Sequence, residues 1–236
     1  MIRFVVVALF VLMSMPTPAF AQHRNMYLEE VSNLPSYYFL GGCRTAGGQL
    51  DVGYLGVPEE IQSEKDKLTS KYSWAIPNSQ AITEISRFSN GSAVDFGAGS
   101  GYWAMLLAEQ GVDVLAIDDW SWGEPDHLWH PVKDGNEDDL VGTSDRTLIM
   151  VWPPRNEMPL DALKVWNGTR LVYVGEILRG NGTPEFFDEI AQWTLVRRIE
   201  IPNWWNRSDA VYLLEKKPGP KWLPDPVSVE AGCKEH

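Results

Sequence analysis

Apolar and polar positions in the middle of the chain follow an alternating order of strand and helix patterns. Short apolar runs rich in β-branched residues predict strands, and the stretches between them, with apolar residues three or four positions apart, predict helices. Repeated strand–helix–strand units predict an α/β fold with a doubly wound, mostly parallel sheet, closed by an antiparallel strand pair. The predicted strands are 93–96, 112–118, 147–152, 171–176, 194–202 and 209–217, and the predicted helices are 79–88, 102–110, 159–166 and 183–193.

Residues that favour helix ends support the predicted helix bounds. Ser79 and Thr183 are candidate helix N-caps, and Gly111 is a candidate helix stop. The stretch 120–139 is predicted to be mostly loop, with a short strand near Val132.

The remaining segments divide the chain into four parts. Residues 22–71 are polar, rich in glycine and without sustained periodicity apart from one candidate solvated helix at 59–72, so we expect an N-terminal extension or cap. The main domain is expected to span 72–217. Residues 218–236 contain Pro and Gly where a core element cannot lie, and are expected to be extended or disordered.

The first 21 residues have the pattern of a secretory signal segment. Arg3 precedes twelve apolar residues at 4–15, and Ala-Phe-Ala at 19–21 has the small residues of a cleavage site. Twelve apolar residues are short for a bilayer span, although an uncleaved anchor and a buried first helix are the alternatives. We therefore expect a secreted or periplasmic protein with no stable membrane insertion after cleavage.

Composition excludes several classes of protein. With 32 Asp and Glu against 20 Lys and Arg, the net charge is -12, so duplex nucleic acid and anionic membranes would repel the chain. Only two cysteines occur, Cys43 and Cys233, which excludes a disulfide-rich scaffold and a multi-cysteine zinc site; export would permit their pairing.

His127 and His130 lack further ligands nearby, so no metal is expected. Four Asn-x-Ser/Thr sequons are interpreted as turn residues: Asn90, Asn167, Asn181 and Asn206.

The most informative segment is a glycine loop that joins the strand at 93–96 to the helix at 102–110. It reads Asp95-Phe96-Gly97-Ala98-Gly99-Ser100-Gly101. Glycines allow the backbone to turn sharply and a ligand to approach closely, and the helix N-terminus offers free N–H groups. The next strand ends at Asp118, where a carboxylate can accept hydrogen bonds from ribose hydroxyls. The pattern therefore indicates a cofactor that contains a nucleoside.

The spacing of this loop distinguishes between cofactors. Dinucleotide sites need G-x-G-x-x-G/A, whereas here the last position is the bulky Tyr102. Asp95 would repel a pyrophosphate but would suit an ammonium group. A nicotinamide-dependent oxidoreductase is therefore a disfavoured alternative. Ser100 also lacks the flanking glycines of a hydrolase nucleophile elbow.

On these residues the chain resembles the class I S-adenosylmethionine-dependent methyltransferases, whose first motif is an acid followed by G-x-G-x-G. The run GAGSGYWA at 97–104, Trp74-Ala75-Ile76-Pro77, Trp152-Pro153-Pro154 and Tyr173-Val174-Gly175-Glu176 resemble a poorly characterised bacterial branch of that superfamily. The resemblance covers about residues 72–216. It implies a Rossmann-like sheet and S-adenosyl-L-methionine as the cofactor.

The resemblance also implies roles for individual residues. Asp95 would face the methionine ammonium, and Asp118 would hold the ribose hydroxyls; an ordinary cap or strand-end carboxylate is the alternative for both. Asp134, expected in the loop after the third strand, would contact the adenine amine unless it is a solvated turn residue. The cofactor would lie on the backbone of Gly97, Ala98, Gly99 and Gly101.

The acceptor is expected at the turn after the fourth strand, formed by Trp152, Pro153, Pro154 and Arg155. For the two prolines, a purely structural role in a rigid strand-to-helix turn is the alternative. Many amino-group methyltransferases carry Asn or Asp, two prolines and an aromatic residue there, and this chain departs from that pattern at both ends. Transfer to nitrogen is therefore not implied. Six tryptophans on nearby loops predict an aromatic rim mixed with core residues: Trp120, Trp122, Trp129, Trp152, Trp204 and Trp205.

Two carboxylates near the expected acceptor position are candidates for a general base. Glu176, expected to end the fifth strand, is the first candidate, and Asp119 is the second; structural roles are the alternative for both. The sequence thus predicts an S-adenosylmethionine-dependent methyltransferase acting on a small-molecule or peptide acceptor. An exported, inactive binding protein of the same fold is the alternative, because the cofactor is made in the cytosol. The sequence specifies neither the acceptor nor the oligomeric state.

Overall fold

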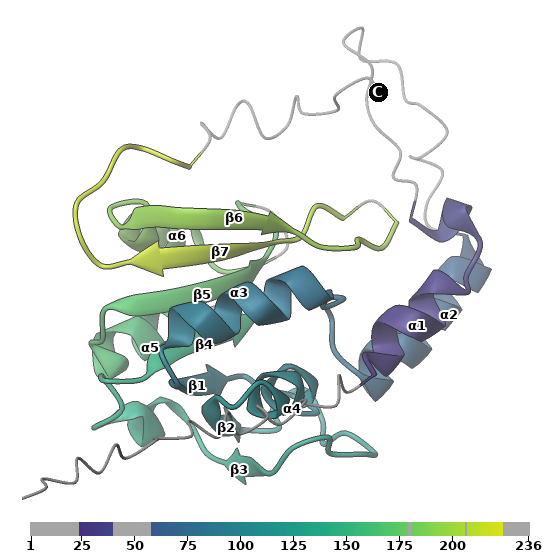
Figure 1. Ribbon diagram of the computed structural model, residues 1–236, viewed down its shortest axis with the longest axis horizontal. Coiled ribbons are helices and arrows are strands. Elements are labelled where there is room, and N and C mark those ends of the chain that lie inside the picture. The colour runs from purple at the N-terminus through teal and green to yellow at the C-terminus, as the bar shows by residue number, and fades with distance from the viewer. Residues whose placement is uncertain (1–23, 40–57, 179–180, 206, 224–236) are drawn as a thin grey trace, which may run out of the picture.

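The computed structural model describes residues 24–39, 58–178, 181–205 and 207–223. Seven strands form one sheet in the order β3-β2-β1-β4-β5-β7-β6 (Figure 1). Strands β1 to β5 are parallel, and β7 runs antiparallel between β5 and β6. This arrangement confirms the predicted α/β, mostly parallel, Rossmann-like sheet. The strands are β1 (Ser92–Phe96), β2 (Asp113–Asp118), β3 (Val132–Asp134), β4 (Thr147–Val151), β5 (Arg170–Gly175), β6 (Thr194–Glu200) and β7 (Ala210–Glu215).

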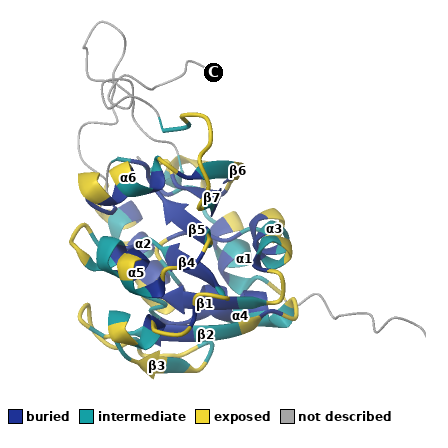
Figure 2. Ribbon diagram, turned by 90° about the vertical axis from the view of Figure 1, so that its left-hand side faces the viewer, coloured by how far each residue is buried: buried dark blue, intermediate teal, exposed yellow. Residues whose placement is uncertain are grey.

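Helices cover both faces of the sheet, and the central strands between them are buried (Figure 2). The first face packs against α3 (Ser79–Ser89) and α4 (Tyr102–Glu109), and the second against α5 (Met158–Trp166) and α6 (Pro184–Ile190). Side chains of each strand alternate between the two faces: Ala93 belongs to the first apolar cluster and Val94 to the second. Burial on both faces explains the continuous apolar strand patterns.

The chain changes direction across the sheet between β1 and β4. From β1 it runs outward through β2 to β3, and it then returns to the other side of β1 as β4. The loops after β1 and β4 therefore diverge at the carboxyl edge of the sheet. Open α/β sheets bind ligands at this position, outside the carboxyl ends of the strands, and it is called the crevice below. The helices α1 (Met26–Ser32) and α2 (Glu59–Lys71) lie beside this edge, on the right of Figure 1.

Several local predictions are confirmed, and others need correction. The helix α2 occupies the predicted solvated stretch, and Thr183 caps α6 by accepting a hydrogen bond from the N–H of Phe186. The cap of α3 is Asn78 rather than Ser79, because the Asn78 side chain accepts from the N–H of Ala81 at 2.8 Å. The helix α6 ends at Ile190, three residues before its predicted end.

Three helical segments have no counterpart in the predictions. The helix α1 lies in the segment that showed no periodicity, and only Tyr27 and Val31 of its seven residues are buried, which is too few to produce a pattern. The short 3₁₀ helix η1 (Ser36–Tyr38) lies in the same segment, and a second, η3 (Glu137–Leu140), begins in the stretch predicted to be mostly loop. In the C-terminal segment, Trp222 packs on Tyr212 and donates a hydrogen bond to the carbonyl of Trp193 at 3.1 Å.

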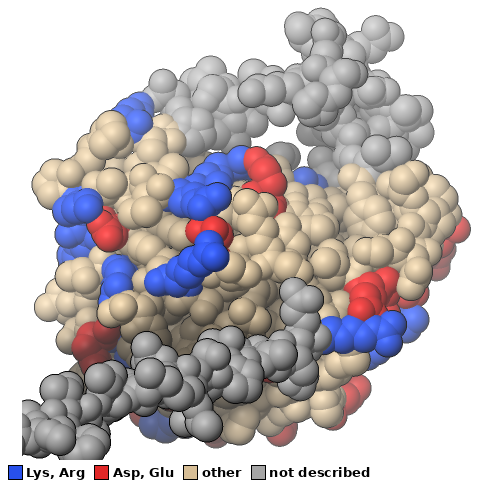
Figure 3. Space-filling view, in the orientation of Figure 1, with Lys and Arg blue, Asp and Glu red and all other residues tan. Residues whose placement is uncertain are grey.

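The outer edge of the sheet at β6 carries charged residues. Arg197 pairs with Glu84 of α3, Arg198 pairs with Glu200, and the strand has a register shift between Leu195 and Arg197. Figure 3 shows basic and acidic groups side by side on this part of the surface. Charges and a bulge on an edge strand oppose its pairing with another chain.

Some sequence predictions concern residues outside the described ranges. These are the signal segment at 1–21, Cys43, Cys233, Asn206 and residues 224–236. Within the described ranges, no helix combines the length and the apolar character needed to cross a membrane.

Candidate cofactor and acceptor site

The glycine loop after β1 is fixed to the neighbouring strand by backbone hydrogen bonds. The N–H groups of Gly97 and Ala98 both donate to the carbonyl of Ile117 in β2, at 2.9 and 3.1 Å. Gly97, Gly99 and Gly101 have φ angles of 75°, 53° and 73°, a region that glycine enters without steric cost. The loop therefore presents its backbone to the crevice in a conformation that other residues adopt only with strain.

Asp118, the last residue of β2, is tied to this loop. One carboxylate oxygen accepts a hydrogen bond from the N–H of Gly99 at 2.7 Å, and the other accepts from Trp120 at 2.9 Å. An ionised carboxylate offers about four acceptor positions, so these two bonds leave capacity for hydroxyl groups of a ligand. The side chain is half-buried at the edge of the crevice, where a ribose could reach it.

Asp95 lies in β1 between two residues of the second apolar cluster, so its side chain points to the first face of the sheet. It is 1% exposed, and neither carboxylate oxygen has a hydrogen-bond partner among the described residues. Burial, with a smaller contribution from the negative charge of Asp118, raises the pKa of Asp95 to about 7. A buried carboxylate without partners is costly, and a ligand ammonium group would satisfy it.

Asp134 lies in a different position from the one expected. It is the last residue of β3, in register with Asp118, rather than part of the loop that follows. Its side chain is exposed, and the next residue, Gly135, donates its N–H to the carbonyl of Asp118 at 3.0 Å. Asp134 therefore stands one strand outward from Asp118 at the same edge of the sheet.

The acceptor turn begins at Trp152, which follows β4 rather than ending it as predicted. Its φ angle is 53°, a left-handed conformation that strains a bulky residue. The main-chain N–H donates to the carbonyl of Val174 at 2.8 Å, and the indole N–H donates to Asp209 Oδ1 at 2.8 Å. The indole also stacks on Trp74, with ring centroids 5.3 Å apart. These contacts hold the ring in one orientation despite the backbone strain.

Left-handed backbone conformations outside glycine concentrate at the same edge of the sheet. Trp120, Trp152 and Leu178 follow β2, β4 and β5, whereas Asn90 and Asn167 simply end α3 and α5. Asparagine tolerates this region at helix ends. For tryptophan and leucine it costs about 1–3 kcal/mol each, and such strain gathers at functional sites.

Glu176, the first candidate base, is the first residue after β5 and is fully occupied by structural contacts. It is 1% exposed; Arg207 donates to Oε2 at 3.1 Å, and the N–H of Ser208 donates to Oε1 at 3.1 Å. The Glu176 N–H donates to Asn181 Oδ1 at 3.0 Å, so this asparagine is a buried structural residue. A carboxylate paired with a guanidinium is a poor proton acceptor, because protonation would break that pair.

The other predicted acceptor residues have structural contacts as well. Asp119, the second candidate base, accepts the N–H of Ser121 at 2.9 Å, and its hydrogen bonds to Ser121 lower its pKa. Pro153 is buried, and its carbonyl accepts from Asn181 Nδ2 at 3.5 Å. Pro154 is half-buried behind it. The two prolines fix the path of the turn, and both candidate carboxylates have structural contacts.

Sequence reasoning missed three charged residues around Trp152. Asp209 directly precedes β7 and is 2% exposed, and Arg207 lies over the Trp152 ring at 5.0 Å from its centroid. Lys65 of α2 is 7% exposed and lies 5.4 Å from the centroid of Trp74. An antiparallel strand begins where its parallel neighbours end, so the start of the predicted strand at 209–217 could have placed Asp209 at this edge.

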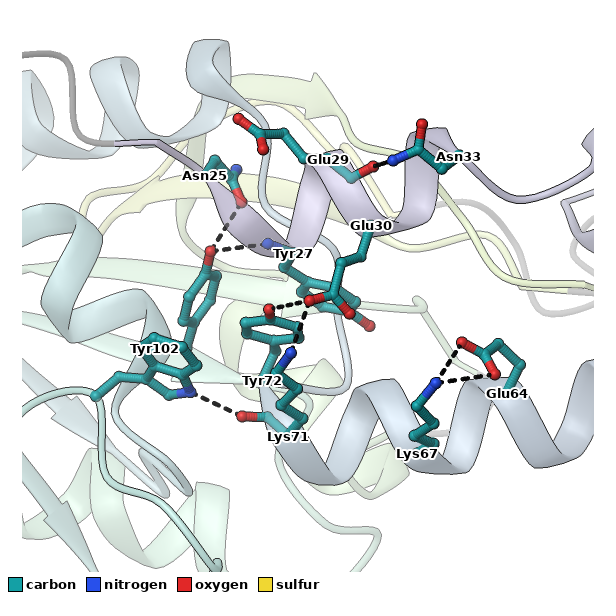
Figure 4. Close-up of polar contacts among 11 residues, drawn as sticks. Asn25, Tyr27, Glu29, Glu30, Asn33, Glu64, Lys67, Lys71, Tyr72 and Tyr102 are labelled. Atoms are coloured by element: carbon teal, nitrogen blue, oxygen red, sulfur yellow. Dashed lines mark hydrogen bonds and ion pairs between the residues drawn. The ribbon is translucent and has the colours of Figure 1, made fainter.

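A cap formed by α1 and α2 is joined to the glycine loop (Figure 4). Tyr27 of α1 stacks on Tyr72 at 4.8 Å and donates its main-chain N–H to the Tyr102 hydroxyl at 3.0 Å. Lys71 and the Tyr72 hydroxyl donate to Glu30 at 2.6 and 2.7 Å. The hydroxyl of Ser100, within the glycine loop, donates to the carbonyl of Tyr72. The position of the cap and the shape of the loop are therefore coupled.

The tryptophans of the expected rim have different environments. Trp204 is buried and donates its indole N–H to the Tyr27 hydroxyl at 3.1 Å, whereas Trp122 is 83% exposed. Trp129 stacks on Tyr72 beneath the cap. These tryptophans therefore range from the core to the exposed surface.

The two histidines of the H-x-x-H segment have separate contacts. The His127 ring packs edge-on against Trp129, and His130 Nε2 lies 3.3 Å from the carbonyl of Val114. Within the described part of the chain, no three His, Cys, Asp or Glu side chains converge as metal ligands would.

Comparisons with known proteins found similar solved structures at low sequence identity. No family model and no curated protein matches the chain. Among solved structures, magnesium protoporphyrin IX methyltransferase (ChlM) from Synechocystis PCC 6803 with bound SAM is 13% identical, with a TM-score of 0.43 over 69% of this chain and 86% of that one. TrmK from M. capricolum, in complex with S-adenosyl-homocysteine, is 11% identical, with a TM-score of 0.42 over 66% of this chain and 76% of that one.

Proposed function

We propose that the protein is an S-adenosylmethionine-dependent methyltransferase that acts on a small-molecule or peptide acceptor. The observation that carries this proposal is the unpartnered, buried carboxylate of Asp95 beneath a glycine loop at the switch point of the sheet. A pyrophosphate would be repelled there, whereas the ammonium of an amino-acid tail would pair with it. A nucleoside joined to an amino acid therefore fits the described residues.

The residues present can be matched to the parts of this cofactor. Asp95 would pair with the ammonium, the glycine loop would lie against the nucleoside, and Asp118 would accept from the ribose hydroxyls in addition to Gly99 and Trp120. The exposed Asp134 is proposed to reach the adenine amine from β3. When bound, the cofactor supplies a methyl group already activated by its sulfonium. The protein then contributes alignment and exclusion of water.

The acceptor would enter from the half of the crevice at β4, β5 and β7. Trp152 follows β4, Glu176 follows β5, and Asp209 precedes β7, so all three lie next to the cofactor half at β1 and β2. We also propose that the protein is exported, on the basis of its N-terminal signal pattern. Export implies an acceptor and a supply of cofactor outside the cytosol.

Calorimetric titration of the full chain with S-adenosylmethionine and S-adenosylhomocysteine tests this proposal. We expect micromolar binding to the wild type and a loss of at least about 100-fold in Asp118→Ala, because the variant loses the ribose acceptor and both loop contacts. Asp188→Asn, which changes an exposed carboxylate of α6 on the opposite face, should bind like the wild type. A folded wild-type protein that binds neither compound would refute the proposal.

A further inference from the structure

The acceptor half of the crevice contains three buried charges and the partly exposed Arg207 around a pair of stacked indoles. Glu176 and Asp209 are the two carboxylates, and Lys65 and Arg207 are the two cations. Arg207 lies over the Trp152 ring, and Lys65 over the Trp74 ring. The four charges balance while all are ionised, which is the condition for tolerating them in a buried site.

The two carboxylates differ in how they are held. Glu176 accepts hydrogen bonds from Arg207 and from Ser208. Asp209 accepts one side-chain bond, from the Trp152 indole, which is a neutral donor. Of the two, Asp209 can therefore take up a proton without breaking an ion pair.

We propose that the acceptor is an aromatic alcohol of the phenol class, and that Asp209 is the catalytic residue that removes its hydroxyl proton. This inference rests on the proposed function and names the substrate class of the same site. Three features of the charge group and its surroundings support it.

The first feature is the electrostatic environment of Asp209. Burial and the neighbouring Glu176 raise the pKa of Asp209 to about 7, while the Trp152 hydrogen bond and the charges of Arg207 and Lys65 oppose this change. The negative charge of Asp209 also acts on three buried tyrosines, and burial raises the pKa of each: Tyr27 of α1, Tyr173 of β5 and Tyr212 of β7. Asp209 can therefore exchange a proton near neutral pH, as an efficient general base must.

The second feature is the charge that remains after proton transfer. Once Asp209 is protonated, Lys65 and Arg207 face a single carboxylate, so the group carries a net positive charge. An oxygen anion on the acceptor restores neutrality and is attracted by both cations. An ammonium group on the acceptor would instead add to that net positive charge, which favours a hydroxyl over an amine.

The third feature is the shape and polarity of the adjoining surface. Trp74 is 48% exposed at the mouth of the site and stacks on the half-buried Trp152. Flat indole surfaces with a few converging polar groups suit a planar aromatic ligand. Trp152 is fixed by its bond to Asp209, so the aromatic wall and the base are positioned together.

The resulting reaction step balances in atoms and electrons. The acceptor O–H bond breaks, and its proton moves to the Asp209 carboxylate. The electron pair left on oxygen forms a bond to the methyl carbon while the methyl–sulfur bond breaks and leaves its pair on sulfur, which changes from a sulfonium to a neutral thioether. Asp209 returns its proton to water when the products leave.

The ionisation of Asp209 can be tested in the protein without cofactor or acceptor. The indole N–H signal of Trp152, identified by its loss in Trp152→Phe, would be followed by NMR from pH 5.5 to 8.5 with ¹⁵N-labelled tryptophan. We expect a titration with a midpoint near 7. In Asp209→Asn, which keeps an oxygen acceptor at Oδ1, the signal should be constant, and Glu176→Gln should move the midpoint to lower pH. A wild-type signal that does not change over this range would overturn the assignment of the base.

The catalytic role is tested with two phenols of different acidity. At pH 8, 4-nitrophenol is largely ionised and needs no base, whereas 4-methylphenol must lose its proton during the reaction. We expect Asp209→Asn to slow methylation of 4-methylphenol by at least about 100-fold and to change that of 4-nitrophenol little. Asp188→Asn on the opposite face should react like the wild type. Equal effects on the two phenols, or none, would overturn the proposal.

Cofactor binding separates failure of this inference from failure of the proposed function. A wild-type protein that binds S-adenosylmethionine by calorimetry but methylates neither phenol would refute the phenol assignment and leave the cofactor proposal intact. A protein that does not bind S-adenosylmethionine would refute the proposed function, and this inference with it.

Discussion

Replacing Asp95 with asparagine should stabilise the ligand-free protein at alkaline pH. The pKa of this carboxyl is raised from 3.8 to about 7, chiefly by burial, and both oxygens lack partners among the described residues. Each pKa unit of difference between the folded and unfolded states is worth about 1.4 kcal/mol, so the charged form costs the folded state about 4 kcal/mol above pH 8. Asparagine avoids this cost because it is neutral at every pH.

The direction of the pH dependence follows from proton binding. Below about pH 3 both states of the wild type hold the proton, and the neutral acid and the amide should be similarly stable. As pH rises toward 7 the unfolded chain releases its proton while folded Asp95 retains it, so wild-type stability falls. The advantage of Asp95→Asn should therefore increase by about 3 kcal/mol between pH 5 and pH 8.5.

Urea unfolding followed by tryptophan fluorescence measures this advantage at the two pH values. At pH 8.5 we expect a higher unfolding free energy for Asp95→Asn and a melting temperature raised on the order of 10 °C. The same variant should bind S-adenosylmethionine at least about tenfold more weakly, because the ammonium loses its counter-charge. Asp188→Asn is the exposed control and should change neither property. A variant that is no more stable than the wild type at pH 8.5 would refute the reasoning.

Four further substitutions and one double variant test the packing around the site, each by urea unfolding. Gly101→Ala should lower the free energy of unfolding by at least about 2 kcal/mol, because φ at this position is 73° and the added Cβ would lie 3.0 Å from His130 Cβ. Gly99→Ala places its Cβ in open space and should lower the free energy of unfolding by about 1 kcal/mol. Tyr27→Phe should cost about 1–3 kcal/mol by leaving a buried indole N–H without its acceptor. Arg207→Met should lower the free energy of unfolding by about 2–3 kcal/mol, because it leaves Glu176 buried and unpaired. Adding Glu176→Gln to this variant should recover most of the lost stability. A double variant no more stable than Arg207→Met would contradict this expectation.

The central sheet was predictable because its signals are local. Strands buried on both faces appear as short apolar runs, and the intervening helices have apolar residues at helical spacing. The predicted bounds of the strand at β1 and the helices α4 and α5 agree with the structure to within one residue. The helix α1 was not predictable, because it is short and is stabilised by Tyr72 and Tyr102, which lie far from it in sequence.

Candidate residues of the cofactor half were easier to identify than those of the acceptor half. Asp95, Asp118 and the glycine loop are linked by a fixed spacing across one strand–helix–strand unit, so a linear pattern reveals them. Glu176 was a reasonable candidate base by position, but its ion pair with Arg207, thirty-one residues away, depends on how β7 returns beside β5. Asp209 had no local signal of its chemistry.

The sequence by itself determined the alternation of strands and helices, the glycine loop and the acids at the ends of β1 and β2, because each depends on neighbouring residues or on one repeating unit. The tertiary structure alone decided which charges are buried, which are paired and which aromatic rings stack. Lys65, Trp152 and Asp209 come from three segments that are far apart in sequence. They interact only because the fold brings these segments together at the edge of the sheet. Electrostatic energies depend on distance in space and on exclusion of water, and sequence spacing encodes neither.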